Sequence, residues 1–238
     1  MSSYLAEQDR QQRIALLVIL GLGSIMLWHA PFGAWLLYPF TILTTWFHEM
    51  GHGIAAIAMG ERFDHLLIYP DGSGVAVSEI SPGRNVVQDA IIAAGGPVGP
   101  GIAGAALIAS SRTLKGTRIA LAVLGVALLV STAIWVRSLT GMIVLPLAGF
   151  AILAIARNAN PDQQRFAIQL LGVQACISVW TQTGYLFTRG GTIGGLPQVS
   201  DTGAVAEALF LPFWFWGIVL SAANVALLWY SFRYAFRR

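Results

Sequence analysis

Long runs of apolar residues, separated by short polar connections, dominate the pattern along the chain. A helix that crosses a bilayer needs about 20 mostly apolar residues. Seven runs are candidates: Ile14–Trp28, Phe32–Met59, Val86–Ser110, Ile119–Trp135, Leu139–Ala156, Phe166–Phe187 and Ala204–Phe232. The runs are continuously apolar and lack the alternation of barrel strands. The pattern therefore predicts an all-α polytopic membrane protein with six or seven transmembrane helices, depending on whether the short first and fourth runs cross.

A polar segment between the second and third runs, Glu61–Asn85, contains a strand–turn–strand pattern. Leu66–Tyr69 and Val75–Val77 are rich in β-forming residues, and Pro70–Gly74 between them has the composition of a turn. The pattern predicts a small β-hairpin. Such a hairpin either offers an edge strand to an extended peptide or only connects two spans, and both interpretations stay open.

Two further segments interrupt the apolar background. Gly95–Gly101 holds six glycines and prolines within the third run, where helix breakers are tolerated only if protein or a water-filled cavity covers the backbone. We favour a small-residue packing face over exposed backbone at a site. Gly190–Asp201 predicts a glycine-rich loop in which Ser200 or Asp201 caps the last helix.

Composition agrees with a membrane protein. The 238 residues are 56% hydrophobic and 11% charged, against about 25% charged in soluble domains. We expect one membrane-embedded domain over residues 1–238, integral to the cell membrane. The net charge of +3 does not indicate nucleic acid, because the basic residues are scattered at the ends of apolar runs, where lipid headgroups lie. The single cysteine, Cys176, cannot form an intramolecular disulfide.

Membrane orientation does not follow from this pattern. With seven crossings and the N-terminus inside, the outer connections hold slightly more Lys and Arg than the inner ones. The reverse placement puts Arg10 and Arg13 outside. The positive-inside rule therefore selects neither arrangement.

The pentad His48-Glu49-Met50-Gly51-His52 lies inside the second apolar run. On a helix, His-Glu-x-x-His places two imidazoles one turn apart on one face, a spacing that suits two ligands of tetrahedral Zn²⁺. Glu49 is then placed to accept a proton from the attacking water. The pentad predicts a membrane-embedded zinc hydrolase, most simply a protease.

Catalytic zinc usually has three protein ligands and one open position. The residues that remain as a third ligand are His29, His65, Glu61, Asp64, Asp71, Glu79, Asp89, Asp201 and Glu207. Spacing along the chain ranks Asp201 and Glu207 first and does not separate them.

Four motifs in order resemble one family. The pentad is followed by Tyr69–Val75, then by Gly95–Pro100, and then by Ser200-Asp201 at the start of the last helix. Over about Trp46 to Leu220 the chain resembles the site-2 protease class, in the M50B-like branch of the M50 metallopeptidases. The resemblance implies a zinc-dependent intramembrane protease that cleaves membrane-protein substrates in or near their transmembrane helices. It implies His48, His52 and Asp201 as zinc ligands and Glu49 as general base.

The chain also departs from the better-known branch of this family. That branch has Asn and Pro before a Leu-Asp-Gly motif, whereas Leu196–Thr202 contains no Asn and no Gly after the Asp. The residue that assists the oxyanion is therefore unassigned. We expect no PDZ-like or cystathionine-synthase-like domain, so that substrate selection is intrinsic or comes from a regulatory partner. The alternatives are a catalytically silent zinc-binding scaffold and a small metal transporter.

Overall fold

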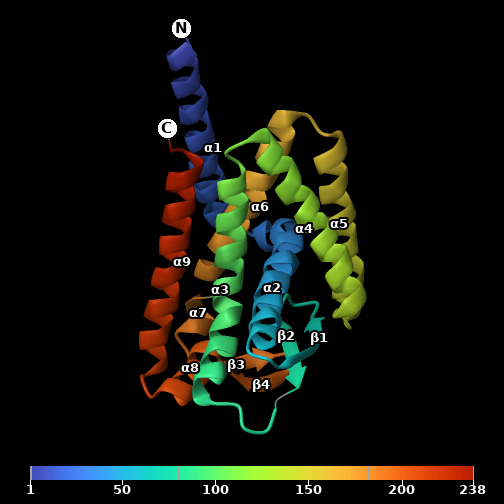
Figure 1. Ribbon diagram of the computed structural model, residues 1–238, viewed down its shortest axis with the longest axis vertical. Helices are drawn as coiled ribbons and strands as arrows, with labels where there is room; N and C mark the ends of the chain where they lie inside the picture. The colour runs from blue at the N-terminus through green and yellow to red at the C-terminus, as the bar shows by residue number, and fades with distance from the viewer. Residues whose placement is uncertain (1, 80, 182, 238) are drawn as a thin grey trace.

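The computed structural model describes residues 2–79, 81–181 and 183–237, and most of them are helical (Figure 1). The helices are α1 Ser2–Trp28, α2 Gly33–Ala58, α3 Val86–Ser110, α4 Leu114–Ile134, α5 Leu139–Asn158, α6 Pro161–Thr181, α7 Thr183–Leu186, α8 Asp201–Leu209 and α9 Phe213–Ala235. The strands are β1 Arg62–Ile68, β2 Gly74–Glu79, β3 Gly190–Ile193 and β4 Leu196–Val199, and they form two antiparallel hairpins. The predicted helical class and the predicted hairpin between α2 and α3 are confirmed.

The molecule has two distinct ends (Figure 1). Both termini lie at one end with the α3–α4 and α5–α6 connections, and we call this the terminal end. The two hairpins, α8 and the start of α3 lie at the other, the strand end. The α4–α5 connection also lies at the strand end, because Leu66 N–H donates to Trp135 O (2.9 Å) and Arg137 N–H donates to Leu66 O (3.0 Å).

Four described helices, α3, α4, α5 and α9, are long and apolar enough to cross a membrane. Residues Ile14–Trp28 of α1 and helix α2 meet at 115°, and as one bent pair they raise the number to as many as five. Six or seven crossings are therefore not confirmed. Helix α6 is not among these candidate spans, and it carries Asp162, Arg165 and several glutamines. The run Ala204–Phe232 is divided between α8 and α9, because Phe210 adopts a left-handed conformation before Pro212.

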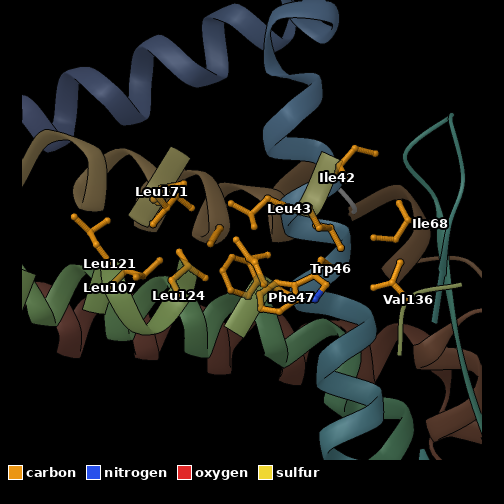
Figure 2. Packing of buried hydrophobic residues seen from close by; sticks show 14 of the residues in the cluster. Ile42, Leu43, Trp46, Phe47, Ile68, Leu107, Leu121, Leu124, Val136 and Leu171 are labelled. Carbon is orange, nitrogen blue, oxygen red and sulfur yellow. The ribbon is translucent and has the colours of Figure 1, made fainter. Parts of the chain in front are cut away.

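Helix α2 passes through the centre of the hydrophobic core (Figure 2). Its residues Ile42, Leu43, Trp46 and Phe47 are buried with leucines of α3, α4 and α6. The Trp46 indole N–H donates to the Ser131 hydroxyl of α4 (2.9 Å), which satisfies the polar atom of this side chain inside the core. The core thus holds the middle of α2, directly before the pentad, in one position.

Helices α2 and α3 pack through glycines. A Cβ atom on Gly95 would lie 2.6 Å from Gly51 O, and one on Gly99 would lie 2.5 Å from Phe47 O, so only glycine permits this approach. The packing-face interpretation is confirmed, and α3 continues as a helix through Pro97 and Pro100. Neighbouring helices supply partners to the backbone near these prolines; Asn224 Nδ2 donates to Pro97 O (3.2 Å).

The turn of the β1–β2 hairpin is held both internally and by α2. Asp71 accepts hydrogen bonds from the Ser73 hydroxyl (2.7 Å) and the Ser73 N–H (2.9 Å), which hold the pKa of Asp71 below its ordinary value. Gly72 has a φ of 87°, the left-handed region that glycine adopts without strain. Its carbonyl accepts from the Thr45 hydroxyl of α2 (2.5 Å). Thr45 lies one turn before Glu49, so the hairpin is fastened beside the pentad.

The segment Gly190–Asp201, expected as a loop, forms the second hairpin β3–β4. Gly194 and Gly195 make its turn with φ values of 57° and 83°, as a type I′ connection requires. The strands are four residues long and contain Gly and Pro, so they lack a β pattern in the sequence. A Cβ on Gly194 would lie 2.5 Å from the Tyr69 ring, so the turns of the two hairpins touch.

Candidate metal centre

The helical spacing of the pentad brings two imidazoles together. His48 and His52 lie one turn apart on α2, and their Nε2 atoms are 3.2 Å apart. His48 is buried and the His52 side chain is 15% exposed. Both rings face α3, since a Cβ atom on Gly96 would lie within 2.7 Å of each Nε2 atom. The two nitrogens therefore point at a shared space.

Helix α8 brings a carboxylate to the same space. Asp201, its first residue, places Oδ2 3.0 Å from His48 Nε2 and Oδ1 3.3 Å from His52 Nε2. One ligand atom from each of these residues lies within 4.8 Å of the others, an arrangement that could hold a metal ion. Glu207, the other carboxylate favoured by spacing, lies farther along α8 and is exposed. The tertiary structure thus places Asp201, and not Glu207, with the histidines.

The remaining carboxylates in the sequence have other surroundings. Glu61 accepts from the Ser81 hydroxyl and N–H, and Asp89 pairs with Arg84. Asp64 pairs with His65, and Glu79 lies 3.5 Å from Arg62.

Two observations show that these residues fit a metal ion. Asp201 Oδ2 is buried and is left without a hydrogen bond among the described residues, although His48 Nε2 lies 3.0 Å from it. A Cβ on Gly96 of α3 would clash with His52 Nε2 and lie 2.7 Å from His48 Nε2, so the space between the nitrogens depends on glycine at this position. Two imidazoles and one carboxylate form a donor set typical of catalytic zinc, with a fourth position left for water or substrate.

A hydrogen bond from the α3 backbone orients one of the two imidazoles. His52 Nδ1 lies 2.8 Å from Ile92 O, which requires a proton on Nδ1 and leaves the Nε2 lone pair directed at Asp201. His48 Nδ1 is buried without a hydrogen-bond partner among the described residues. The orientation of His48 therefore rests on packing and on the group at its Nε2.

The Glu49 carboxylate lies beside the ligands and against β2. Glu49 is buried, and a Cβ on Gly74 would lie 2.8 Å from its Oε1. The Ala76 backbone N–H is directed at the same carboxylate. This arrangement aims one carboxylate at the space beside the histidines from the strand side, while Asp201 approaches from α8.

A cavity of about 910 Å³ gives access to this centre. Its walls come from α2, from β2, from the β3–β4 hairpin, from the start of α3 and from α8. Glu49, both histidines and Asp201 line it, and Trp28 of α1 reaches its edge. The cavity is large enough to admit a peptide segment to the cluster.

The whole arrangement falls within one family match. The family model described as Peptidase M50B-like matches residues 14–231, which include the pentad and Asp201. The chain belongs to this family. Comparison with curated proteins and with solved structures finds no match. M50 peptidases are zinc enzymes in general, in agreement with the donor set.

A hydrogen-bond network fixes the carboxylate of this M50B-like peptidase. The Ser200 hydroxyl accepts from Gly203 N–H (3.0 Å), as an N-cap does, and donates to Thr188 O (2.5 Å). The Thr202 hydroxyl donates to Leu186 O (2.8 Å). The predicted cap at Ser200 is confirmed, and the residues on both sides of Asp201 are hydrogen-bonded to the end of α7 and to the residues after it.

No sequence pattern identifies Tyr185, a residue that lines the cavity of the M50B-like peptidase. Tyr185 of α7 lines the cavity, and its hydroxyl donates to Val199 O (3.3 Å), two residues before Asp201. Its ring packs on Gly191 of β3. A lone tyrosine at the end of an apolar run carries no motif, so only the tertiary structure brings it to the site.

Substitution of Gly96 by alanine is expected to weaken zinc binding at least tenfold. The added methyl group would take up space between the two Nε2 atoms, and His52 cannot easily retreat because Ile92 O holds its Nδ1. Zinc titration against a competing chelator measures the effect. Gly21→Ala is the matched control, since a Cβ there meets nothing within 4 Å. Equal zinc affinity in both variants would show that the metal does not lie beside Gly96.

Proposed function

We propose that the protein is a zinc-dependent intramembrane metalloprotease that hydrolyses peptide bonds in or near transmembrane segments of membrane proteins. The observation that carries the proposal is the convergence of His48, His52 and Asp201 on a space kept open by Gly96, with Glu49 alongside. The family match and the apolar helices around this cluster support it. In this proposal the two histidines and Asp201 hold the zinc ion.

Glu49 performs the proton transfers in this proposal. Zinc, when bound, would supply Lewis acidity toward water and toward the scissile carbonyl. The Glu49 carboxylate accepts a proton from the attacking water and delivers it to the amine nitrogen as the C–N bond breaks. Its burial shields it from bulk water, and the Ala76 N–H and the packing on Gly74 hold its side chain in place.

The outer edge of strand β2 runs along the cavity, and its Ala76 N–H is directed at Glu49. The N–H and C=O of Leu66 in β1 bond to the α4–α5 connection and thus point away from β2. In an antiparallel pair the opposite residue also points outward, and Leu66 lies opposite Ala76. Residues Gly72–Ala76 line the cavity, so this outer edge faces it. We propose that an unwound substrate segment pairs with β2 there, which places its peptide bonds beside Glu49.

Proline substitutions at two neighbouring positions test the strand pairing. Ala76→Pro removes the outward N–H that is also directed at Glu49. Loss of strand pairing is expected to raise KM for a membrane-protein substrate at least tenfold, whereas displacement of Glu49 alone would lower kcat; zinc content and Tm are expected to stay unchanged. Val75→Pro, the matched variant, removes an N–H that points toward Leu67 of β1 and is expected to lower Tm. Full activity of Ala76→Pro would exclude pairing at this edge.

Metal content tests the proposed function directly. Protein purified in detergent is expected to contain one zinc per chain by elemental analysis. 1,10-Phenanthroline is expected to remove the zinc and to stop cleavage of single-span membrane segments reconstituted with the protein, and added Zn²⁺ should restore cleavage. A folded protein without zinc would contradict the proposal.

A further inference from the structure

The oxygen that becomes charged during the proposed hydrolysis has no assigned side-chain donor. When water adds to a scissile carbonyl, negative charge develops on the carbonyl oxygen, and hydrogen-bond donors aimed at that oxygen stabilise it. The segment Leu196–Thr202 before and at the start of α8 contains no Asn that could act in this way. A side-chain donor for this oxygen would therefore come from another part of the cavity wall.

The side-chain donors of the wall that lie one turn before the pentad already have acceptors. Thr44 donates to Thr41 O (3.0 Å), and Thr45 donates to Gly72 O (2.5 Å). The second of these bonds fastens the β1–β2 turn to α2. Transfer of either proton to a substrate would break a contact that holds the cavity wall together.

The Tyr185 hydroxyl has a different setting, directly beside the candidate ligand Asp201. Its bond to Val199 O is long (3.3 Å) and exposed, and the Asp201 backbone N–H is directed at the phenolic oxygen. The carboxylates of Asp201 and Glu49 both interact electrostatically with this hydroxyl. The Tyr185 hydroxyl thus lies in the cavity near the general base and the metal ligand of the proposed reaction, and its proton is held by a weak bond.

Local packing holds Tyr185 so that only its proton needs to move. A Cβ on Gly191 would lie 3.4 Å from the Tyr185 ring, so the ring rests on β3. The next residue, Leu186, is buried, and its carbonyl accepts from the Thr202 hydroxyl of α8 (2.8 Å). A hydroxyl proton turns about its C–O bond while the ring stays in place. The proton can therefore turn from Val199 O toward a charged oxygen in the cavity.

We propose that the Tyr185 hydroxyl donates a hydrogen bond to the oxygen of the scissile carbonyl, which makes Tyr185 a further catalytic residue of this peptidase. The inference rests on the proposed function, because it assigns a role in the same reaction. The proton stays on Tyr185 throughout, while Glu49 carries the proton that passes from water to the amine. A hydrogen bond to a charged oxygen is about twice as strong as one to a neutral carbonyl. The bond therefore forms mainly in the transition state, and its loss lowers kcat more than it changes KM.

Tyr185→Phe and Tyr38→Phe form a matched pair that tests this role. Each removes one phenolic hydroxyl that donates to a backbone carbonyl of a hairpin, Val199 O for Tyr185 and Pro70 O (3.0 Å) for Tyr38. Tyr38 is not part of the described cavity wall. With a single-span substrate reconstituted with the protein, Tyr185→Phe is expected to lower kcat by about 10²–10³-fold, with KM, zinc content and Tm unchanged. Tyr38→Phe is expected to keep the wild-type kcat.

Binding of a phosphinic peptide gives a second measurement that does not depend on turnover. Its tetrahedral phosphinate carries negative charge where the carbonyl oxygen develops it, as transition-state analogues do. The dissociation constant for zinc-loaded Tyr185→Phe is expected to rise by about the same factor by which kcat falls, and that for Tyr38→Phe is expected to stay at the wild-type value.

The outcomes separate this inference from the proposed function. If wild-type protein cleaves the substrate and Tyr185→Phe cleaves it equally fast, the inference is wrong and the proposed function stands. If zinc-loaded wild-type protein does not cleave, the proposed function is wrong, and the phosphinic peptide still decides: equal affinity for wild type and Tyr185→Phe overturns the inference. Loss of zinc or a lower Tm in Tyr185→Phe, but not in Tyr38→Phe, would show a structural role for the hydroxyl and would overturn it as well.

Discussion

Replacement of Glu49 by glutamine is expected to reduce peptide-bond hydrolysis by about 10²–10⁴-fold, the usual contribution of a general base. Glutamine has nearly the same shape, so the packing against Gly74 and the contact with the Ala76 backbone are retained. Its amide cannot accept the proton of the attacking water. Because Glu49 is not among the three grouped ligand residues, the zinc content is expected to stay at one per chain.

The measurement is the rate of cleavage of a reconstituted membrane-protein substrate, with zinc determined in the same preparation. Asp71→Asn is a suitable control, because Asp71 also lines the cavity but belongs to the hairpin turn. Full proteolysis by Glu49→Gln would exclude Glu49 as the general base. If wild-type protein binds zinc and cleaves no more than Glu49→Gln does, the protein is a catalytically silent zinc-binding scaffold.

Replacement of Asp201 by alanine is expected to lower zinc affinity by at least about 100-fold, beyond the 10- to 100-fold typical when a supporting partner of a ligand is lost. The substitution removes the one carboxylate that approaches both imidazoles and leaves two ligands for zinc. The start of α8 is expected to persist, because its cap depends on the Ser200 hydroxyl and not on the Asp201 side chain. Loss of proteolysis is expected to follow the loss of zinc.

Glu207→Ala is the matched control for Asp201→Ala. Both carboxylates belong to α8 and both line the cavity, so the pair separates a metal ligand from a charge in the wall. Elemental analysis of both variants after gel filtration measures the difference, and Tm confirms that each is folded. Zinc retained in Asp201→Ala and lost in Glu207→Ala would assign the third ligand to Glu207.

Local patterns carried a large part of the fold and of the candidate site. The four-residue spacing of His48 and His52 on a helix sets their common face, since the helical period alone decides which residues are neighbours. Turn chemistry around Gly72 determined the first hairpin, and hydroxyl chemistry at Ser200 determined the cap of α8. Each of these features depends on residues within about one or two turns along the chain.

Contacts between distant segments decided the rest. Asp201 and Glu207 are equivalent by spacing, and only the packing of α8 against α3 brings the first of them to the histidines. Gly96 belongs to a small-residue motif in the sequence, but its neighbour across the interface is the imidazole pair.

The second hairpin and the number of crossings were beyond the sequence for similar reasons. Strands β3 and β4 contain Gly and Pro and pair with each other across a two-glycine turn. Their sequences lack the alternation of apolar and polar residues that predicts a strand. Because of the bend between α1 and α2, these two helices form at most one crossing. A hydropathy pattern gives the length of an apolar run but not the direction in which the helix runs. By itself the sequence indicated a metal-binding motif on a helix and the residues able to contribute to it. The tertiary structure decided which of those residues meet, because that choice depends on how helices pack and not on their periods.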